Sequence, residues 1–408
     1  MANVLWLMVD EMSMLTTPML VHLSRVAGVV RTGLTLVESS VPFGGMSMVL
    51  LGDLHQFPPI ANTTKELYHP LPPNGVCQLG RNLFEQFDTV IKLDEQIRVQ
   101  DNEWNDILQR TRTGDCTKDD ITTIRKLVLT NPECDLPDFS LPPWNKSILV
   151  TSRNSVRSAW NDFMLSQHAH RSGRIKYIVY ANDQTNGQPL TNQQRLAIAH
   201  LKMDQTYHLP HKIELVIGMN AMVTTNISPE MDLANGSRGT VEDIILDPRE
   251  RFHDNDTNTI RLQYPPAAVL FKPLFRQNRQ FPGLPNEIIP IFPSQKSFKL
   301  GGRSGIRVQR EQLALTLAYA FTDFKAQGQT IESVVVDLGK PPSGNLTGFN
   351  AYVSLSRSRG RNTIRLLRDF DERLFTVHPN EHLRREDARL ERLEDETKIR
   401  YDAGEFHT

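Results

Sequence analysis

Two acidic residues follow an apolar run near the start of the chain. The run covers residues 4–9 and shows no alternation of apolar and polar side chains, which is typical of a parallel strand buried on both faces. Asp10 and Glu11 then lie at the carboxyl end of that strand, where open α/β sheets bind their ligands. There Asp10 could hold Mg²⁺ through water, and Glu11 could orient the attacking water in nucleotide hydrolysis. Apolar strands that end in acids are also common without any catalytic role.

A second apolar run, residues 46–51, is followed by Gly52 and Asp53, with Gln56 three residues further on. These residues put a carboxylate and an amide at the tip of a neighbouring strand. An amide both donates and accepts hydrogen bonds, so Gln56 could sense a γ-phosphate. The phosphate-cradling loop G-x-x-x-x-G-K-[ST] occurs nowhere in the sequence. The sequence therefore carries the acidic part of a nucleotide site without its phosphate loop.

Length and composition narrow the class of protein. A chain of 408 residues with ordinary apolar and charged fractions has room for two or three domains. The net charge of −1 excludes a strongly basic coat, so any nucleic-acid site must be a local groove. Cys77, Cys116 and Cys134 lack metal-ligand spacing, which indicates a reducing compartment and no zinc site. No apolar run is long enough to cross a membrane.

Strand and helix patterns alternate along most of the chain. From Gly218 to residue 264 they change to short alternating strands with Asn-Gly and Arg-Gly turns, as in a small β-barrel. Residues 265–305 read as long hairpins or loops. Helices are also predicted over residues 79–87, over 104–110 with an end near Gly114, and over 381–401, a mixed-charge segment that should be solvated. Strands are predicted over residues 89–93, 148–151 and 334–338.

Three later blocks are rich in polar and basic residues. The first ends in Arg98, the second covers residues 320–330, and the third, residues 352–359, contains Arg357. Each alone also fits a surface charge or a solvated turn. In their order and spacing, however, the blocks resemble those of the petite-integration-frequency (PIF-type) DNA helicases, a RecD-like branch of helicase superfamily one. The resemblance covers roughly residues 5–369, and it extends in particular to copies found with fungal Helitron-type transposons.

The resemblance implies a role for each matching position. Asp10 corresponds to the metal-binding carboxylate, and Arg98 and Arg357 to two arginines that reach the γ-phosphate from the second motor domain. A planar, permanently charged guanidinium stabilises charge on the transferring phosphoryl group. The implied catalytic residues are Glu11, Gln56, Arg98 and Arg357, and the implied nucleotide-binding residues are Asp10, Asp53 and Gly328.

The block at residues 320–330 is implied to face single-stranded DNA. Lys325, Gln327 and Thr330 match polar residues of the family. Phe324 stands where the family usually has His, so a hydrogen bond is lost, but the ring can still stack on a base. Phe321 would supply a second ring, unless both rings belong to the core.

The implied fold is α/β, with two RecA-like parallel-sheet motor domains, the first incomplete, and an SH3-like β-barrel inserted in the second. The expected boundaries are 1–92 for the first motor domain, 93–217 and 312–375 for the second, 218–311 for the insertion with its loops, and 376–408 for a charged helical tail.

The implied function is an ATP-dependent, 5′-to-3′ DNA helicase that uses Mg²⁺ and ATP and acts on single-stranded DNA and duplex junctions. We expect a monomer, no membrane contact, and a nuclear or mitochondrial location. Because the phosphate loop is missing, we expect an N-terminally truncated chain that hydrolyses almost no ATP alone. One alternative is a non-hydrolysing, single-strand-binding remnant of a transposon helicase. A weaker one is a metal-dependent nuclease built on Asp10, Glu11 and Asp53, which fits none of the arginine blocks.

Overall fold

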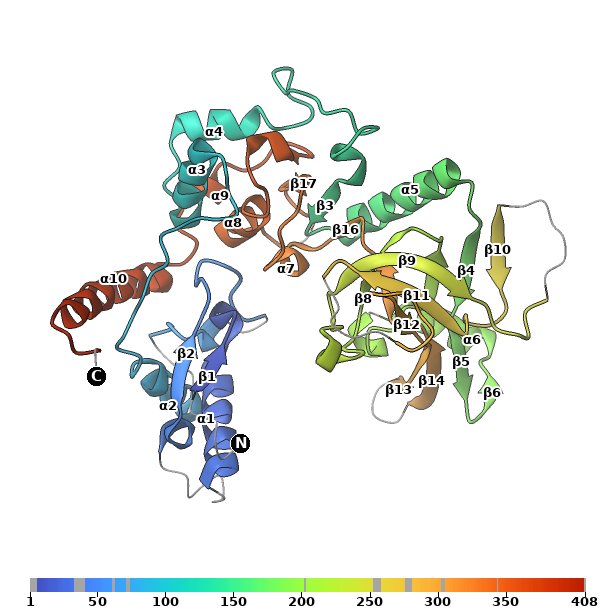
Figure 1. Cartoon of the computed structure of the whole chain (residues 1–408), viewed down its shortest axis with the longest axis horizontal. Coiled ribbons are helices and arrows are strands. Elements are labelled where there is room, and N and C mark those ends of the chain that lie inside the picture. The colour runs from blue at the N-terminus through green and yellow to red at the C-terminus, as the bar shows by residue number, and fades with distance from the viewer. Residues whose placement is uncertain are drawn as a thin grey trace. The chain divides into compact units, whose positions relative to one another are not determined.

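The computed structural model describes residues 6–32, 41–60, 63–70, 74–201, 203–251, 258–275, 281–301, 305–342 and 344–406. The chain divides into two compact units, which we describe separately (Figure 1). Unit 1 comprises Met1–Ser152 and Thr322–Thr408, and unit 2 comprises Arg153–Phe321. Residues 4 and 5 of the first predicted strand lie outside the described residues.

Unit 1 contains two parallel sheets. In the first, β1 (Trp6–Val9) pairs with β2 (Ser47–Leu50). In the second, β17 (Val334–Asp337) lies between β3 (Ile148–Thr151) and β18 (Ile364–Leu366), and both neighbours are parallel to it. Parallel strands joined through helices make this an α/β fold, so the predicted fold class is confirmed at that level.

The helices of unit 1 begin and end at residues that the sequence marks. The side chain of Asn74 accepts a hydrogen bond from the N–H of Cys77 at the start of α2, and Gly114, with φ 78°, ends α3. No helix in the described ranges combines the length and apolar character needed to cross a bilayer. The helices are α1 (Thr17–Thr32), α2 (Gly75–Phe84), α3 (Asn102–Thr113), α4 (Lys118–Arg125), α7 (Asp323–Ala326), α8 (Gly348–Leu355), α9 (Arg373–Thr376) and α10 (Glu381–Asp402).

The first sheet is buried on one face only. Leu7 and Val9 of β1 pack against a core formed with α1 and α2, whereas Trp6 and Met8 are 60% and 66% exposed. The prediction of a strand buried on both faces was therefore wrong. In the described part of the chain, this sheet has two strands, and its core lies on the face where α1 and α2 pack.

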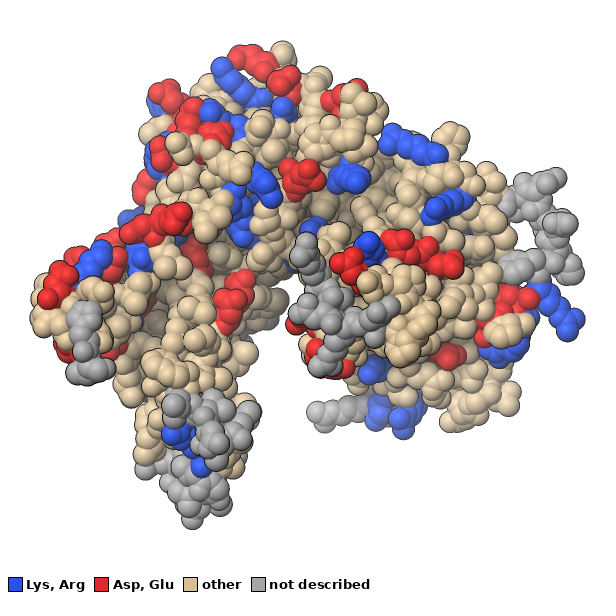
Figure 2. Space-filling model, in the orientation of Figure 1, with Lys and Arg blue, Asp and Glu red and all other residues tan. Residues whose placement is uncertain are grey.

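Two further predicted elements differ from the structure. Residues 89–93, all of them described, form no strand, and Ile91 and Leu93 are 77% and 89% exposed. The predicted charged helix is present as α10, and acidic and basic side chains mix along it (Figure 2). It is not wholly solvated, because Leu383 packs with Leu54 in an apolar cluster.

Unit 2 is built mainly from antiparallel strands. Its main core surrounds a five-stranded sheet, whose strands in spatial order are β12 (Ile289–Ile291), β11 (Ala268–Pro273), β9 (Arg238–Ile245), β8 (Asn220–Val223) and β15 (Leu315–Leu317). The short strands predicted after Gly218 are present, and residues 265–305 contain β11, β12 and β13. Its elements are α5 (Asn154–Ser172), β4 (Lys176–Tyr180), β5 (Asn182–Thr185), β6 (Gln188–Pro189), α6 (Asn192–Ala199), β7 (Lys212–Leu215), β8 (Asn220–Val223), β9 (Arg238–Ile245), β10 (Thr259–Leu262), β11 (Ala268–Pro273), β12 (Ile289–Ile291), β13 (Ser294–Leu300), β14 (Ile306–Gln312), β15 (Leu315–Leu317) and β16 (Ala320–Phe321).

Candidate nucleotide and DNA site

The acidic pair predicted for nucleotide chemistry lies at the carboxyl end of β1. The N–H of Leu51 donates to the carbonyl of Val9 at 2.8 Å, and the N–H of Met12 donates to the carbonyl of Leu51 at 2.9 Å, so β1 and β2 end together. Glu11 has a left-handed φ of 55°, and its N–H donates to Oδ1 of Asp10 at 2.8 Å. Asp10 is exposed, and an exposed carboxylate suits Mg²⁺, which keeps several of its waters.

Asp53 is held by two side chains that the sequence reasoning missed. Arg112 on α3 donates from Nη2 to Oδ1 of Asp53 at 2.9 Å, and the hydroxyl of Tyr352 on α8 donates to Oδ2 at 3.0 Å. Burial acts to raise the pKa of Asp53, but the Arg112 guanidinium holds that pKa below its ordinary value. Asp53 is therefore ionised and joins the loop after β2 to both helices.

Glu11 contacts the segment predicted to face DNA. The amide Nε2 of Gln327 donates to Oε2 of Glu11 at 2.6 Å, and Oε1 of the same amide accepts the N–H of Phe57 at 3.3 Å. Gly328 follows with φ +73°, and a Cβ at that position would lie 3.3 Å from Oε1 of Glu11. One amide thus connects the predicted water-activating carboxylate to the loop after β2.

The side chain of Gln56 has a buried acceptor. Its backbone N–H donates to the carbonyl of Asp53 at 3.0 Å, which closes a turn. Its Oε1 is buried and has no hydrogen-bond partner among the described residues. Because buried polar atoms are rarely left unpaired, this oxygen is suited to accept from a water molecule.

Arg98 borders a pocket of about 600 Å³. Its Nε donates to Oγ1 of Thr330 at 3.0 Å, and its Nη1 donates to the carbonyl of Ser356 at 3.3 Å. Burial lowers its pKa. The residues that line the pocket are Glu95, Gln96, Ile97, Arg98, Gln100, Thr330 and Arg359.

Arg357 is a buried cation that is 1% exposed. Its Nε donates to the carbonyl of Val353 at 2.7 Å, and its Nη2 donates to Oγ of Ser356 at 2.7 Å. Burial, and then the nearby positive charge of Arg98, lower its pKa to about 10. In the described part of the chain, neither arginine forms an ion pair with a carboxylate. Two neighbouring guanidinium groups without a counter-ion favour a bound anion.

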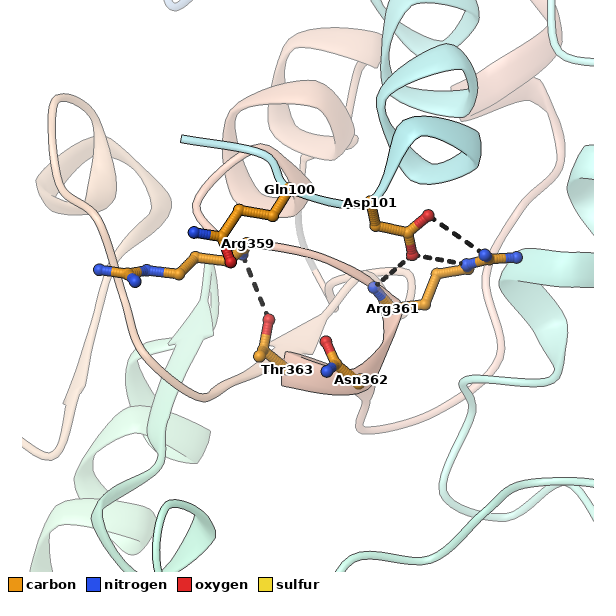
Figure 3. A pocket seen from close by; sticks show the side chains of 6 residues that line it. All are labelled: Gln100, Asp101, Arg359, Arg361, Asn362 and Thr363. Carbon is orange, nitrogen blue, oxygen red and sulfur yellow. Dashed lines mark hydrogen bonds and ion pairs between the residues drawn. The ribbon is translucent and has the colours of Figure 1, made fainter. Parts of the chain in front are cut away.

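Arg359 was not singled out from the sequence, although the alternation of Arg357, Arg359 and Arg361 could have drawn attention to it. It is exposed and lines both the pocket beside Arg98 and an adjoining one of about 450 Å³. In Figure 3 its guanidinium points away from Arg361, which is bonded to Asp101 at 2.7 Å. Arg359 is therefore the arginine of this block whose charge faces an open pocket.

The predicted DNA-facing residues occupy α7 and the turn after it. Phe324 is 40% exposed and its ring stacks on that of Phe57, with centroids 4.0 Å apart. Lys325 is half-buried on the same helix, and Thr330 is exposed. Phe321 is only 1% exposed, so the expectation that it supplies a second stacking ring was wrong.

Sequence comparison finds similarity to known DNA helicases. Residues 1–120 match the family model described as PIF1-like helicase. The chain is 24% identical to the ATP-dependent DNA helicase RRM3 of Saccharomyces cerevisiae, over 95% of this chain and 54% of that protein. It is 26% identical to the ATP-dependent DNA helicase PIF1 of Xenopus laevis, over 91% and 48% of the two. The chain is thus similar to PIF1-like helicases. It spans about half the length of these relatives.

Solved structures of Pif1 helicases share the fold. The crystal structure of Pif1 helicase from Candida albicans matches with a TM-score of 0.63 and 20% identity, over 95% of this chain and 76% of that one. The structure of Bacteroides Pif1 bound to single-stranded DNA matches with a TM-score of 0.59 and 17% identity, over 94% and 75%. At these identities the likeness shows a Pif1-like fold.

Proposed function

We propose that this chain works as part of an ATP-dependent DNA helicase that moves 5′ to 3′ along single-stranded DNA. The names of its relatives and the shared Pif1-like fold support the activity. The observation that carries the proposal is the 2.6 Å hydrogen bond between Gln327 and Glu11. It would give a direct path between the residues proposed for DNA binding and those proposed for hydrolysis.

Coupling follows from what the two ends of this path contact. Phe324 lies three residues before Gln327, and its half-exposed ring stacks on the ring of Phe57. The N–H of Phe57 in turn donates to the side-chain oxygen of Gln327. A base that stacks on Phe324 moves α7 and with it the amide. Glu11 then gains or loses its partner, which changes how well it orients the attacking water.

The nucleotide would lie beside Arg98. The open pocket there is bordered by Arg98 and Arg359, with buried Arg357 adding positive charge behind it. Asp10 would hold Mg²⁺, and that ion neutralises charge on the phosphates. Gln56 would use its unpaired oxygen to position water. The sequence contains no phosphate-binding loop of the G-x-x-x-x-G-K-[ST] type.

Several finer features belong to the same proposal. The domain boundaries at residues 92, 217, 311 and 375, the SH3-like character of the insertion, and the likeness to Helitron-associated copies rest on the motif resemblance. A monomer that acts on single strands and duplex junctions, in the nucleus or mitochondrion, is the form we propose.

A second candidate is a single-strand-binding protein that hydrolyses no ATP. The missing phosphate-loop motif favours it, and so does the exposed ring of Phe324, which can bind a base without nucleotide.

Hydrolysis assays on the native protein that carries this sequence separate the two candidates. We expect single-stranded DNA to stimulate ATP hydrolysis, and Glu11→Gln to abolish it while DNA binding is retained. We also expect duplexes with 5′ overhangs to be unwound in preference to those with 3′ overhangs. DNA binding without any hydrolysis by the wild type would overturn the first candidate in favour of the second.

A further inference from the structure

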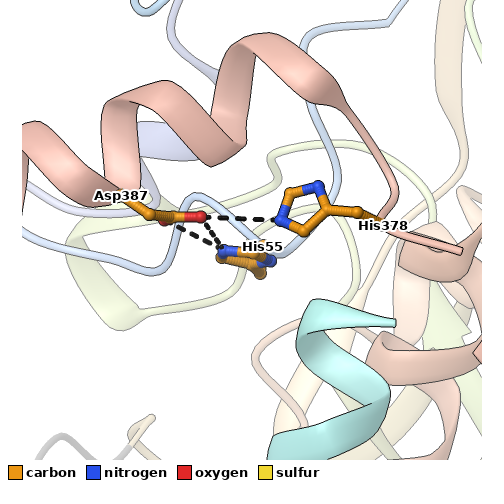
Figure 4. Close-up of side chains that lie close together, drawn as sticks. All are labelled: His55, His378 and Asp387. Carbon is orange, nitrogen blue, oxygen red and sulfur yellow. Dashed lines mark hydrogen bonds and ion pairs between the residues drawn. The ribbon is translucent and has the colours of Figure 1, made fainter. Parts of the chain in front are cut away.

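Two histidines and an aspartate from separate parts of unit 1 converge beside α10 (Figure 4). His55 follows β2, His378 precedes α10, and Asp387 lies on α10. Nε2 of His55 is 3.0 Å from both carboxylate oxygens of Asp387, and Nε2 of His378 is 3.6 Å from Oδ2. None of the three residues is among those proposed above for nucleotide or DNA, although the N–H of His55 donates to Oδ1 of Asp53 at 3.0 Å.

The tautomer of His55 leaves its contact with Asp387 incomplete. Nδ1 of His55 lies 2.8 Å from the carbonyl oxygen of Arg112, which can only accept, so the ring proton is on Nδ1. In the neutral ring, Nε2 then presents a lone pair to a carboxylate at 3.0 Å. Either a cation at Nε2 or a second proton on the ring removes that repulsion.

The distances suit a small tetrahedral cation. Ligands about 2.0–2.1 Å from zinc lie about 3.3 Å from one another, and the observed separations of 3.0 and 3.6 Å bracket that value. The three ligand atoms all lie within 4.8 Å of one another. Metal-bound histidines usually donate their other N–H to a carbonyl or carboxylate, as His55 does to Arg112.

His378 needs one adjustment to act as a ligand. The N–H of Asn380 donates to its Nδ1 at 3.3 Å, so without metal the ring proton is on Nε2. Metal binding moves the proton to Nδ1 and gives up this long hydrogen bond. Asp387 retains 25% of its side-chain exposure, which leaves a path for the ion and room for a water as fourth ligand. The nearby charge of Arg112 is already paired with Asp53.

We propose that His55, His378 and Asp387 form a zinc site that connects α10 to the loop after β2. The site needs no nucleotide or DNA, so it stands apart from the proposed helicase activity. Zinc bound there would stabilise the packing of α10 on unit 1, because the ligands come from both sides of that contact.

The test is to titrate the metal-free full chain with Co²⁺ and then with Zn²⁺. We expect one Co²⁺ per chain with the visible absorption of tetrahedral cobalt, no thiolate-to-metal band, displacement by Zn²⁺, and a higher melting temperature with Zn²⁺. A strong thiolate band would assign the metal to cysteine, and absence of both binding and stabilisation would assign the contact to a protonated His55; either result overturns the proposal.

Variants localise the site. Asp387→Asn keeps the size of the side chain and an acceptor oxygen. Asp387→Asn and His378→Gln, made as single variants, should each weaken metal binding by about 10- to 100-fold or more. The matched control is His382→Gln, which removes a histidine of α10 that is not a proposed ligand and should bind as the wild type does. His55→Gln should also weaken metal binding. If that variant fails to fold, Asp387→Asn, His378→Gln and His382→Gln still test whether the metal binds at this cluster. Equal affinities in Asp387→Asn and His382→Gln would contradict the assignment.

Discussion

The two parallel sheets of unit 1 look alike in sequence and differ in burial. β1 and β2 are apolar runs whose outer face is open, with Trp6 and Met8 more than half exposed. The strands β3 and β17 are also largely apolar, and Leu149 and Val335 are fully buried. An unbroken apolar run therefore predicts a parallel strand, but the layers packed on the sheet decide which faces are buried.

The largest expected difference is in core truncation. Leu149→Ala should lower the free energy of unfolding by about 2–5 kcal/mol, because it opens a cavity in a closed core. Met8→Ala, on the open face of β1, should change it by less than about 0.5 kcal/mol. Denaturant unfolding of the full chain measures both. Equal losses would show that the outer face of β1 is covered in solution.

A smaller, pH-dependent effect is expected beside the first sheet. Glu66 is 1% exposed, and burial raises its pKa from 4.5 to about 7. The folded protein therefore favours the neutral carboxyl of Glu66. The stability that Glu66 contributes is fully present below pH 4.5 and is lost as the pH rises through 7. Glu66→Gln should therefore stabilise the protein by about 2–3 kcal/mol at pH 8 and have little effect at pH 4. The same change in stability at both pH values would contradict the burial argument.

The second sheet's region should show the opposite pH dependence. Two hydrogen bonds of 2.7 Å from Arg110 lower the pKa of Asp120 to about 2, and Asp120 also completes the capping box of α4. The resulting stability is present above pH 3.8 and is lost as the pH falls towards 2. Asp120→Asn should lower the free energy of unfolding by about 1–2 kcal/mol at pH 7, measured by thermal unfolding. The matched control is Asp115→Asn, which changes an exposed aspartate nearby. A loss that persists unchanged at pH 2 would rule out the ion pair as its cause.

Local signals made part of this structure predictable. Apolar runs gave the strands at residues 6–9, 148–151 and 334–337, and Gly114 gave the end of α3. The run at 89–93 failed because it has no partner strand, and pairing is a property of the assembled sheet. The sequence could not predict that Phe324 is exposed and Phe321 buried, because both are apolar residues in one short block.

Contacts between distant residues could not be read from spacing. Asp53 is bonded to Tyr352, 299 positions away, and His55 to Asp387, 332 positions away. Motif resemblance pointed to Arg98 and Arg357, but it did not show that Arg357 is buried on backbone carbonyls while Arg359 faces the open pocket. Residue type gives the available chemistry, and packing decides which side chain is free to use it.

The amide of Gln327 connects Glu11, after the first sheet, to the segment that we propose to face DNA. The central claim is that this hydrogen bond transmits DNA binding to hydrolysis. The direct measurement is ATP turnover of the native protein with and without saturating single-stranded DNA, for Gln327→Ala and for the neighbouring control Gln329→Ala. We predict that Gln327→Ala loses about tenfold or more of the stimulation by DNA, while Gln329→Ala retains it. Full stimulation in Gln327→Ala would contradict the account.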